Sequence, residues 1–234
     1  MTDQLIIGSK ASFDDFFASV AKRTIGMPKK KSIKETVPYS NETYDFSAIN
    51  GELYWEEREL EYVFEIIAPT PEKLEELKTA FATWVMNVQG EELHDPFIPD
   101  YHFKATYGDM DFDDEEGLEK TTATVTFTAY PYKIANYPTV YEGREVSPET
   151  LHIGVNNPSG HPVKAVLSLT YEDGTYDGKR VGIGLNDKLW TMDAVDAVNR
   201  EIVLPTGTSA LLFHSVLETY GAYTVKLTFT EEVF

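Results

Sequence analysis

The fold of the first half of this chain rests on the stretch RELEYVFEII at residues 58–67. Apolar residues occupy alternate positions from Leu60 to Ile66, and Glu59, Glu61 and Glu65 lie between them on the other face. Strict alternation over eight residues predicts a β-strand with one buried face and one wet, charged face. The glutamates repel one another unless Lys or Arg lies across from them. This face can therefore meet a basic partner, or it can be solvated.

A long helix is expected directly after this strand. Thr70 is suited to the N-cap and Pro71 to the first helical position, where a missing N–H costs nothing. Apolar residues then recur at spacings of three and four from Leu74 to Val88, and Gly90 supplies a stop signal. The predicted helix spans residues 71–89, and it lies on the apolar face of an antiparallel sheet to form an α+β layer.

Weaker signals flank this unit. Phe13, Phe16, Phe17 and Val20 have helical spacing, which predicts a short helix that Ser12 caps and that packs on its own core or docks a partner. Strands are expected at 33–37, 102–107 and 121–130. Residues 133–148 hold two prolines and a glycine and are interpreted as a linker.

The second half reads as strands almost throughout. Six short runs bounded by turn residues predict an antiparallel β-sandwich, with a short helical turn at 192–198. The runs are 151–155, 163–171, 180–185, 201–204, 208–213 and 223–230. We therefore expect a mainly β protein with an N-terminal α+β domain at 1–135 and a C-terminal sandwich at 136–234.

Composition excludes several classes of protein. The 234 residues carry a formal net charge of −19, so a sequence-reading nucleic-acid binder is not expected. The chain has no cysteine, which excludes disulfides, thiolate metal sites and a cysteine nucleophile. The N-terminus does not resemble a signal peptide, and no stretch approaches the roughly 20 apolar residues of a membrane helix. A protein made in a cytoplasm, without a membrane partner, is therefore predicted.

The acidic run from Asp109 to Gly117 is interpreted as a loop. Asp109, Asp111 and Asp113 have the spacing that opens an EF-hand, but Asp114 stands where that loop needs glycine and Lys120 where it needs glutamate. Flanking helices are not expected either, so the EF-hand interpretation fails. Weak cation binding, a solvated loop and an interface loop stay open.

Other chemistry is sparse in the sequence. His94 and His102 can meet at a metal, although histidines in strands and turns beside prolines are more often not ligands. Trp55, Trp84 and Trp190 can stack on sugars, but Trp84 belongs to the buried helix face. No metal site, cofactor site or catalytic residue is expected, and the chain is predicted not to be an enzyme.

The order of several motifs carries more information than any one of them. In chain order the motifs are Asp15-Phe16-Phe17, Arg23, Gly26-Met27-Pro28, Tyr44-Asp45-Phe46-Ser47, Arg58-Glu59-Leu60, the long helix with Trp84, and Phe127-Thr128-Ala129-Tyr130-Pro131-Tyr132. This order resembles the distal tail protein (Dit) family of siphophages and related prophages over residues 10–133. The run Asn199 to Thr208 is similar to part of that family's second domain.

The resemblance implies a structural role in the virion tail tip. Six copies would form a homo-hexameric ring, assembled in the host bacterial cytoplasm, that joins the tail tube and tape-measure region to tail-associated or receptor-binding proteins. The second domain would be a galectin-like sandwich, and DNA would pass through the ring lumen. The alternative is a carbohydrate-binding sandwich that recognises glycans on the host cell surface.

Two candidate surfaces follow from this comparison. The strand of residues 58–67 offers an oligomer interface. The acidic run offers a lining for the lumen, because a negative wall lets DNA slide instead of sticking. The interface candidates are Arg58, Glu59, Glu61, Val63 and Glu65. The lumen candidates are Asp109, Asp111, Asp113, Asp114, Glu115 and Glu116.

Overall fold

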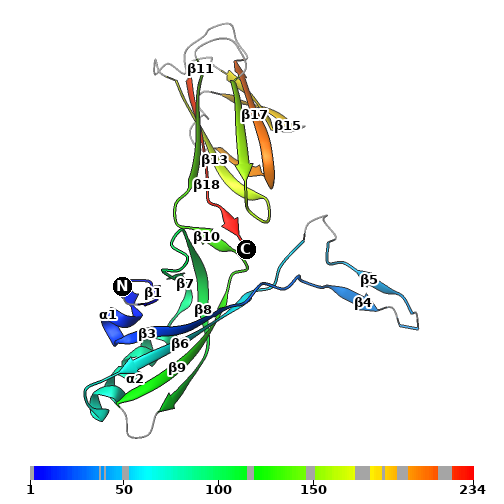
Figure 1. The fold of residues 1–234 in the computed structure, drawn as a ribbon. Helices are drawn as coiled ribbons and strands as arrows, with labels where there is room; N and C mark the ends of the chain where they lie inside the picture. Colours follow the sequence, from blue (N-terminus) through cyan, green and yellow to red (C-terminus); the bar gives the residue numbers. More distant parts are fainter. Residues whose placement is uncertain are drawn as a thin grey trace. The chain divides into compact units, whose positions relative to one another are not determined.

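The computed structural model describes residues 3–36, 38–39, 41–48, 53–114, 119–145, 151–171, 180–185, 188–193, 200–215 and 223–234. The chain forms two compact units, Met1–Ile134 together with Phe234, and Ala135–Val233 (Figure 1). Antiparallel strands dominate both units, which confirms the mainly β fold. None of the helices among the described residues is long and apolar enough to cross a bilayer.

The first unit is built on one antiparallel sheet. Its strands run in the order β2-β1-β7-β8-β9-β6-β3, so β3 and β2 form the two edges. A separate ribbon of two strands, β4 and β5, pairs with neither edge. The elements are β1 (Ile6–Ile7), β2 (Lys10–Ala11), α1 (Ser12–Phe16), β3 (Ala18–Ile25), β4 (Lys34–Thr36), β5 (Thr43–Asp45), β6 (Arg58–Ile67), α2 (Pro71–Met86), β7 (Gln89–His94), β8 (Tyr101–Asp114) and β9 (Lys120–Ala129).

Strand β6 has the predicted bounds and the predicted two faces. Leu60, Tyr62, Phe64 and Ile66 are buried, and β6 pairs with β9 on one side and β3 on the other. The apolar face is covered by α2, whose Phe81 ring lies 5.1 Å from the Phe64 ring. Burying this aromatic contact and its neighbours supplies the main driving force for the unit.

Helix α2 begins where the sequence predicts and ends earlier. The Thr70 hydroxyl accepts a hydrogen bond from the Lys73 N–H at 3.3 Å, and Pro71 is the first helical residue. The helix stops at Met86, not at residue 89. Gly90, with φ +71°, lies instead at a register shift in β7. Its left-handed backbone serves a β-bulge and not the helix end, because a bulge also favours glycine.

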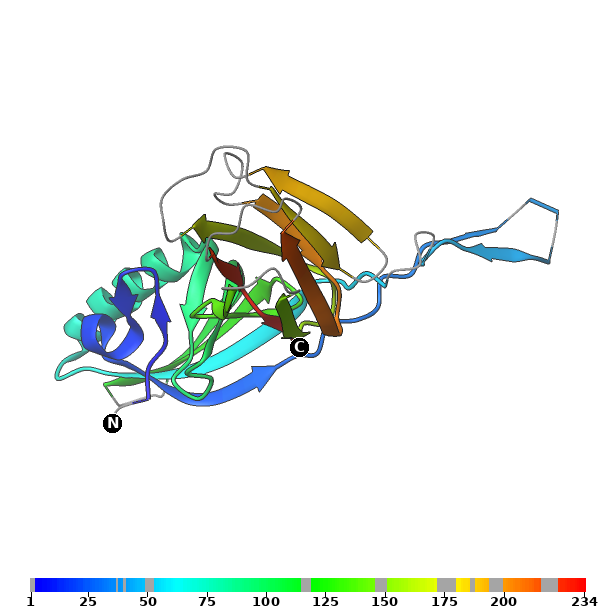
Figure 2. The ribbon, with the colours of Figure 1, turned by 90° about the horizontal axis from the view of Figure 1, so that it is seen from above.

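The predicted N-terminal helix is mostly wrong. Only Ser12–Phe16 is helical; Phe17 adopts a left-handed backbone with φ 55° and β3 starts at Ala18. Ser12 does not cap the helix, since its hydroxyl accepts a hydrogen bond from the Leu5 N–H. Val20 is buried because it alternates with more exposed residues in β3. Its position in that strand also happens to have helical spacing from the preceding phenylalanines. Figure 2 shows the short helix beside α2, where Phe16 stacks on Trp84 at 4.8 Å.

A buried ionic network ties the start of the chain to the sheet. The Asp95 side chain has no exposed surface and accepts hydrogen bonds from Arg23 Nε at 2.9 Å and from the Tyr62 hydroxyl at 3.2 Å. Arg23 also pairs with Asp3, and its guanidinium lies 4.1 Å from the Phe97 ring centroid. Burial, with the nearby Asp95 charge, raises the pKa of Tyr62 well above its ordinary range.

The second unit is a sandwich of two antiparallel sheets, ordered β11-β18-β13-β16 and β12-β17-β14-β15. Both sheets contribute to one hydrophobic core, for example Leu227 and Phe213. Its elements are β11 (Thr139–Glu145), β12 (Leu151–Asn157), β13 (Val163–Tyr171), β14 (Arg180–Leu185), β15 (Lys188–Asp193), β16 (Arg200–Leu204), β17 (Gly207–Ser215) and β18 (Tyr223–Phe229). Two short strands, β10 (Lys133–Ala135) and β19 (Glu232–Val233), pair with each other and lie outside both sheets of the sandwich.

Two predictions for this half need correction. Residues 133–145 are not a linker, because β10 and β11 occupy most of them and β11 pairs with β18 along its whole length. The predicted helical turn at 192–198 begins inside β15, and residues 194–199 lie outside the described part of the chain. The six predicted strands are present; three of them are one to three residues longer than expected, and the last ends one residue earlier.

The ionic network gives a stability prediction. We expect Arg23→Ala to lower the free energy of unfolding by roughly 3–5 kcal/mol, because the buried Asp95 carboxylate loses its charged partner. The neighbouring Lys22 is the matched control, since its side chain is 66% exposed and lies 3.7 Å from Glu61. Lys22→Ala should cost less than about 1 kcal/mol. Urea unfolding followed by circular dichroism measures both, and equal losses would contradict the role given to Asp95.

Candidate functional site

The acidic run is a strand and not a loop over its described part. Asp109–Asp114 form the end of β8 and pair with Thr121–Thr126 of β9. Met110 and Phe112 pack against the core while Asp109, Asp111 and Asp113 are exposed. The alternation was visible in the sequence, but the density of carboxylates hid it. Glu115 and Glu116 lie outside the described residues.

The structure brings the two predicted surfaces onto one face of one sheet. Thr126 of β9 lies between Asp109 of β8 and Glu61 of β6, and Thr122 lies between Asp113 and Glu65. We call this surface the acidic face. Its carboxylate residues are Glu59, Glu61, Glu65, Asp109, Asp111 and Asp113, and Thr122, Thr124, Thr126 and Thr128 run between them.

Few cations balance the acidic face. Lys22 Nζ lies 3.7 Å from Glu61 and Lys120 Nζ lies 3.2 Å from Glu65. Among the described residues, no ion pair is formed by Asp109, Asp111 or Asp113. The face therefore keeps a negative potential, and Val63 is the apolar residue that β6 places within it.

Asp114 departs from this pattern. Its carboxylate lies 2.8 Å from Lys78 Nζ of α2, and this hydrogen bond, with a further one from Thr121, lowers the pKa of Asp114. Burial alone would lower the pKa of Lys78, but the bonds to Asp114 and Glu75 outweigh it and raise that pKa. Asp114 therefore links the C-terminal end of β8 to α2, and its carboxylate is not available to line a lumen as the sequence predicted.

Arg58 does not belong to an exposed interface. It points to the opposite face from Glu59, is 2% exposed, and lies 5.6 Å from the Phe103 ring centroid. Its Nε and Nη2 atoms have no hydrogen-bond partner among the described residues. Burial lowers the pKa of its guanidinium. The prediction failed because Arg58 has the same parity as Leu60 and Tyr62, so the strand directs it inward.

The ribbon of β4 and β5 carries an apolar surface that the sequence did not single out. Every described side chain of the two strands is exposed, and Figure 1 shows the ribbon apart from the large sheet. Tyr44 and Phe46 stack on one another, with 6.4 Å between ring centroids, and both stay exposed. Ile33, Leu53 and Tyr54 nearby are exposed too. An apolar patch of this kind marks a contact surface.

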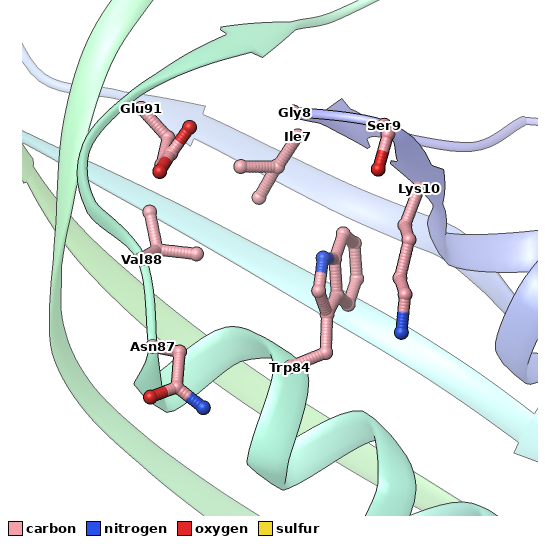
Figure 3. A pocket seen from close by; sticks show the side chains of 8 residues that line it. All are labelled: Ile7, Gly8, Ser9, Lys10, Trp84, Asn87, Val88 and Glu91. Atoms are coloured by element: carbon pink, nitrogen blue, oxygen red, sulfur yellow. The ribbon is translucent and has the colours of Figure 1, made fainter.

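A surface pocket of about 270 Å³ lies where α2 ends. Figure 3 shows Trp84 at its centre, with Lys10 on one side and Ile7 and Val88 on the other. Trp84 is thus half-buried and not part of a sealed helix face. One indole face is already occupied by Phe16. Trp55 packs elsewhere, at 4.8 Å from Phe234, so the tryptophans form no shared sugar platform among the described side chains.

His94 and His102 do come together, as the metal hypothesis required. Their ring centroids are 5.2 Å apart on neighbouring strands. Glu92, which the sequence interpretation missed, completes the group at 3.4 Å from His94 Nε2 and 3.9 Å from His102 Nε2. A spacing of two along β7 places Glu92 and His94 on the same face, and this was the overlooked signal.

Comparison with known proteins identifies the fold. No family model and no curated protein matches the chain. The crystal structure of the Dit (gp 19.1) protein of phage SPP1, described as a paradigm of the hub adsorption apparatus in phages infecting Gram-positive bacteria, matches over 100% of both chains with 11% identity and a TM-score of 0.67. The chain therefore has the fold of this distal tail protein over both units.

Weaker matches come from the phage p2 baseplate in its activated conformation. The form with Sr covers 97% of this chain and 98% of its own, with 9% identity and a TM-score of 0.41. The form with Ca covers 99% and 98%, with 9% identity and a TM-score of 0.33.

The contact between Asp114 and Lys78 predicts a titration difference. We expect Lys78→Met to raise the pKa of Asp114 toward the ordinary value of about 3.9, measured by carboxyl ¹³C NMR. Lys73→Met is the control, since Lys73 pairs with Glu76 and should leave Asp114 unchanged. Because the folded pKa is depressed, this contact stabilises the fold above the unfolded pKa and is lost as pH falls through the folded pKa. An unchanged Asp114 in Lys78→Met would contradict the contact.

Proposed function

We propose that this chain is a structural protein of a phage tail tip. In this proposal six copies form a hub ring that joins the tail tube to tail-associated or receptor-binding proteins. The observation that carries the proposal is the likeness to the SPP1 Dit protein over the full length of both chains, with a TM-score of 0.67. A likeness confined to the sandwich would have fitted many unrelated functions, because such folds host many of them.

The ribbon of β4 and β5 supports self-assembly. A closed ring needs a heterologous contact, in which one surface of a copy meets a different surface of the next. The exposed rings of Tyr44 and Phe46 are suited to one side of such a contact, since aromatic residues dominate interface cores. Strand β3, at the longer edge of the sheet, offers backbone groups for the other side.

The acidic face supports a role as the lumen wall. It is opposite to the face that α2 covers, and its carboxylates outnumber the lysines that pair with them. In a ring with this face inward, the wall would repel DNA phosphates and let DNA move through. The interface that the sequence predicted on Glu59, Glu61, Val63 and Glu65 then becomes part of the lumen, and contacts between copies fall to the ribbon and the sheet edges.

The assembly proposal is tested by the ribbon. We expect the purified protein to form six-fold rings in electron microscopy and a hexamer by light scattering at high concentration. The double variant Tyr44→Ser, Phe46→Ser should remain monomeric while unfolding within about 0.5 kcal/mol of the parent, because both side chains are exposed. Tyr137→Ser changes a still more exposed aromatic residue in the second unit and should leave rings intact. Rings that survive the double variant would contradict the role of the ribbon.

The lumen proposal is tested by the orientation of the sheet in the ring. Electron microscopy at a resolution that separates strands should place β8 and β9 against the pore and α2 on the outside. Cysteine introduced at Asp111 should then react slowly with a bulky maleimide in rings, while cysteine at Glu72 on α2 should react as fast as in monomers. A pore walled by α2 or by basic side chains would overturn this proposal.

A further inference from the structure

The cluster of Glu92, His94 and His102 has the composition of a transition-metal site. Its one carboxylate oxygen and two imidazole nitrogens lie within 4.8 Å of one another. Two imidazoles and a carboxylate suit zinc, whereas calcium and magnesium take oxygen ligands. We propose that these three side chains bind one Zn²⁺ per chain, with water in the fourth position.

The strand register builds this cluster. Leu93 of β7 pairs with Phe103 of β8 in antiparallel register, so the next residues along the two strands, His94 and His102, stand opposite each other. Glu92 lies two residues before His94 and therefore on the same face. The three ligands come from two hydrogen-bonded strands, which fix their backbones before any metal arrives.

The distances are close to those that zinc requires. Tetrahedral ligands at a metal distance of about 2.0–2.1 Å lie about 3.3 Å from one another. Glu92 Oε2 to His94 Nε2 is 3.4 Å, and Glu92 Oε1 to His102 Nε2 is 3.9 Å. These two distances end on different oxygens of Glu92, and the three ligand atoms lie within 4.8 Å of one another, so side-chain rotations are needed to bring one oxygen and both nitrogens to the zinc distance. His102 is nearly buried while Glu92 is 66% exposed, which gives one anchored ligand and an open path for the ion.

Lys104 is the cation nearest in register, since it lies across from Glu92. Its side chain leans toward Gly90, where Cε lies 3.5 Å from the position that a Cβ would take. This direction is away from His94 along β7. The ammonium therefore does not occupy the position between the two histidines, although its charge weakens cation binding.

The test is zinc binding by the full-length protein after dialysis against EDTA. Isothermal titration with ZnCl₂, in the presence of excess MgCl₂ to occupy other carboxylates, should show one tight site per chain. His94→Ala and Glu92→Gln should each weaken that site at least ~10-fold. Both side chains are at least partly exposed, so both variants should fold as the parent does, which circular dichroism checks.

Two further variants make the result specific. His152→Ala removes an exposed histidine of the second unit and should leave zinc affinity unchanged. Lys104→Gln removes the opposing charge and should strengthen binding. Bound Co²⁺ should give the visible absorption of a four-coordinate site in the parent and not in His94→Ala. The proposal fails if the parent binds zinc no more tightly than His94→Ala, or if His152→Ala loses as much affinity. Neither result depends on whether the protein forms rings.

Discussion

The first unit depends on a single constraint, that its sheet has one apolar face and one helix to cover it. Phe81 of α2 packs on Phe64 of β6, and this contact closes the core on one side only. The other face stays in water, so its positions can hold charged side chains without the cost of burying them. The aspartates of β8 and the glutamates of β6 gather there for that reason. A wet face of this kind is a consequence of the layer arrangement.

Strongly periodic segments could be predicted from the sequence. Segments whose structure depends on pairing with strands far away in the chain could not. Strand β6 and the start of α2 follow from alternation, from Thr70 and from Pro71. The end of α2 could not be predicted from the sequence, because Gly90 belongs to a β-bulge where β7 pairs with β8. Val20 has helical spacing from Phe13, Phe16 and Phe17 but is placed by pairing with Phe64. In both cases strand pairing overrode the local pattern.

The candidate sites show the same division. The sequence named His94 and His102, but only the register of β7 and β8 adds Glu92 to them. It also named the acidic residues of two segments without showing that they share a face, since that requires β9 between them. The exposed rings of Tyr44 and Phe46 were hidden for another reason. When a sequence is searched for core residues, every aromatic residue is a candidate for burial.

The edges of the large sheet are unequal, and this limits how strands of another copy can be added to it. One edge, β2, has two residues, whereas the other, β3, has eight and is interrupted by a register shift between Val20 and Lys22. Lys22 and Arg23 follow that shift directly. A second copy can pair with part of β3, but the bulge and the exposed Lys22 prevent it from extending the backbone ladder along the whole edge. Asp3 already accepts a hydrogen bond from the Val20 N–H, so only a short part of this edge is left for contacts between copies, and an unlimited stack of strands is disfavoured.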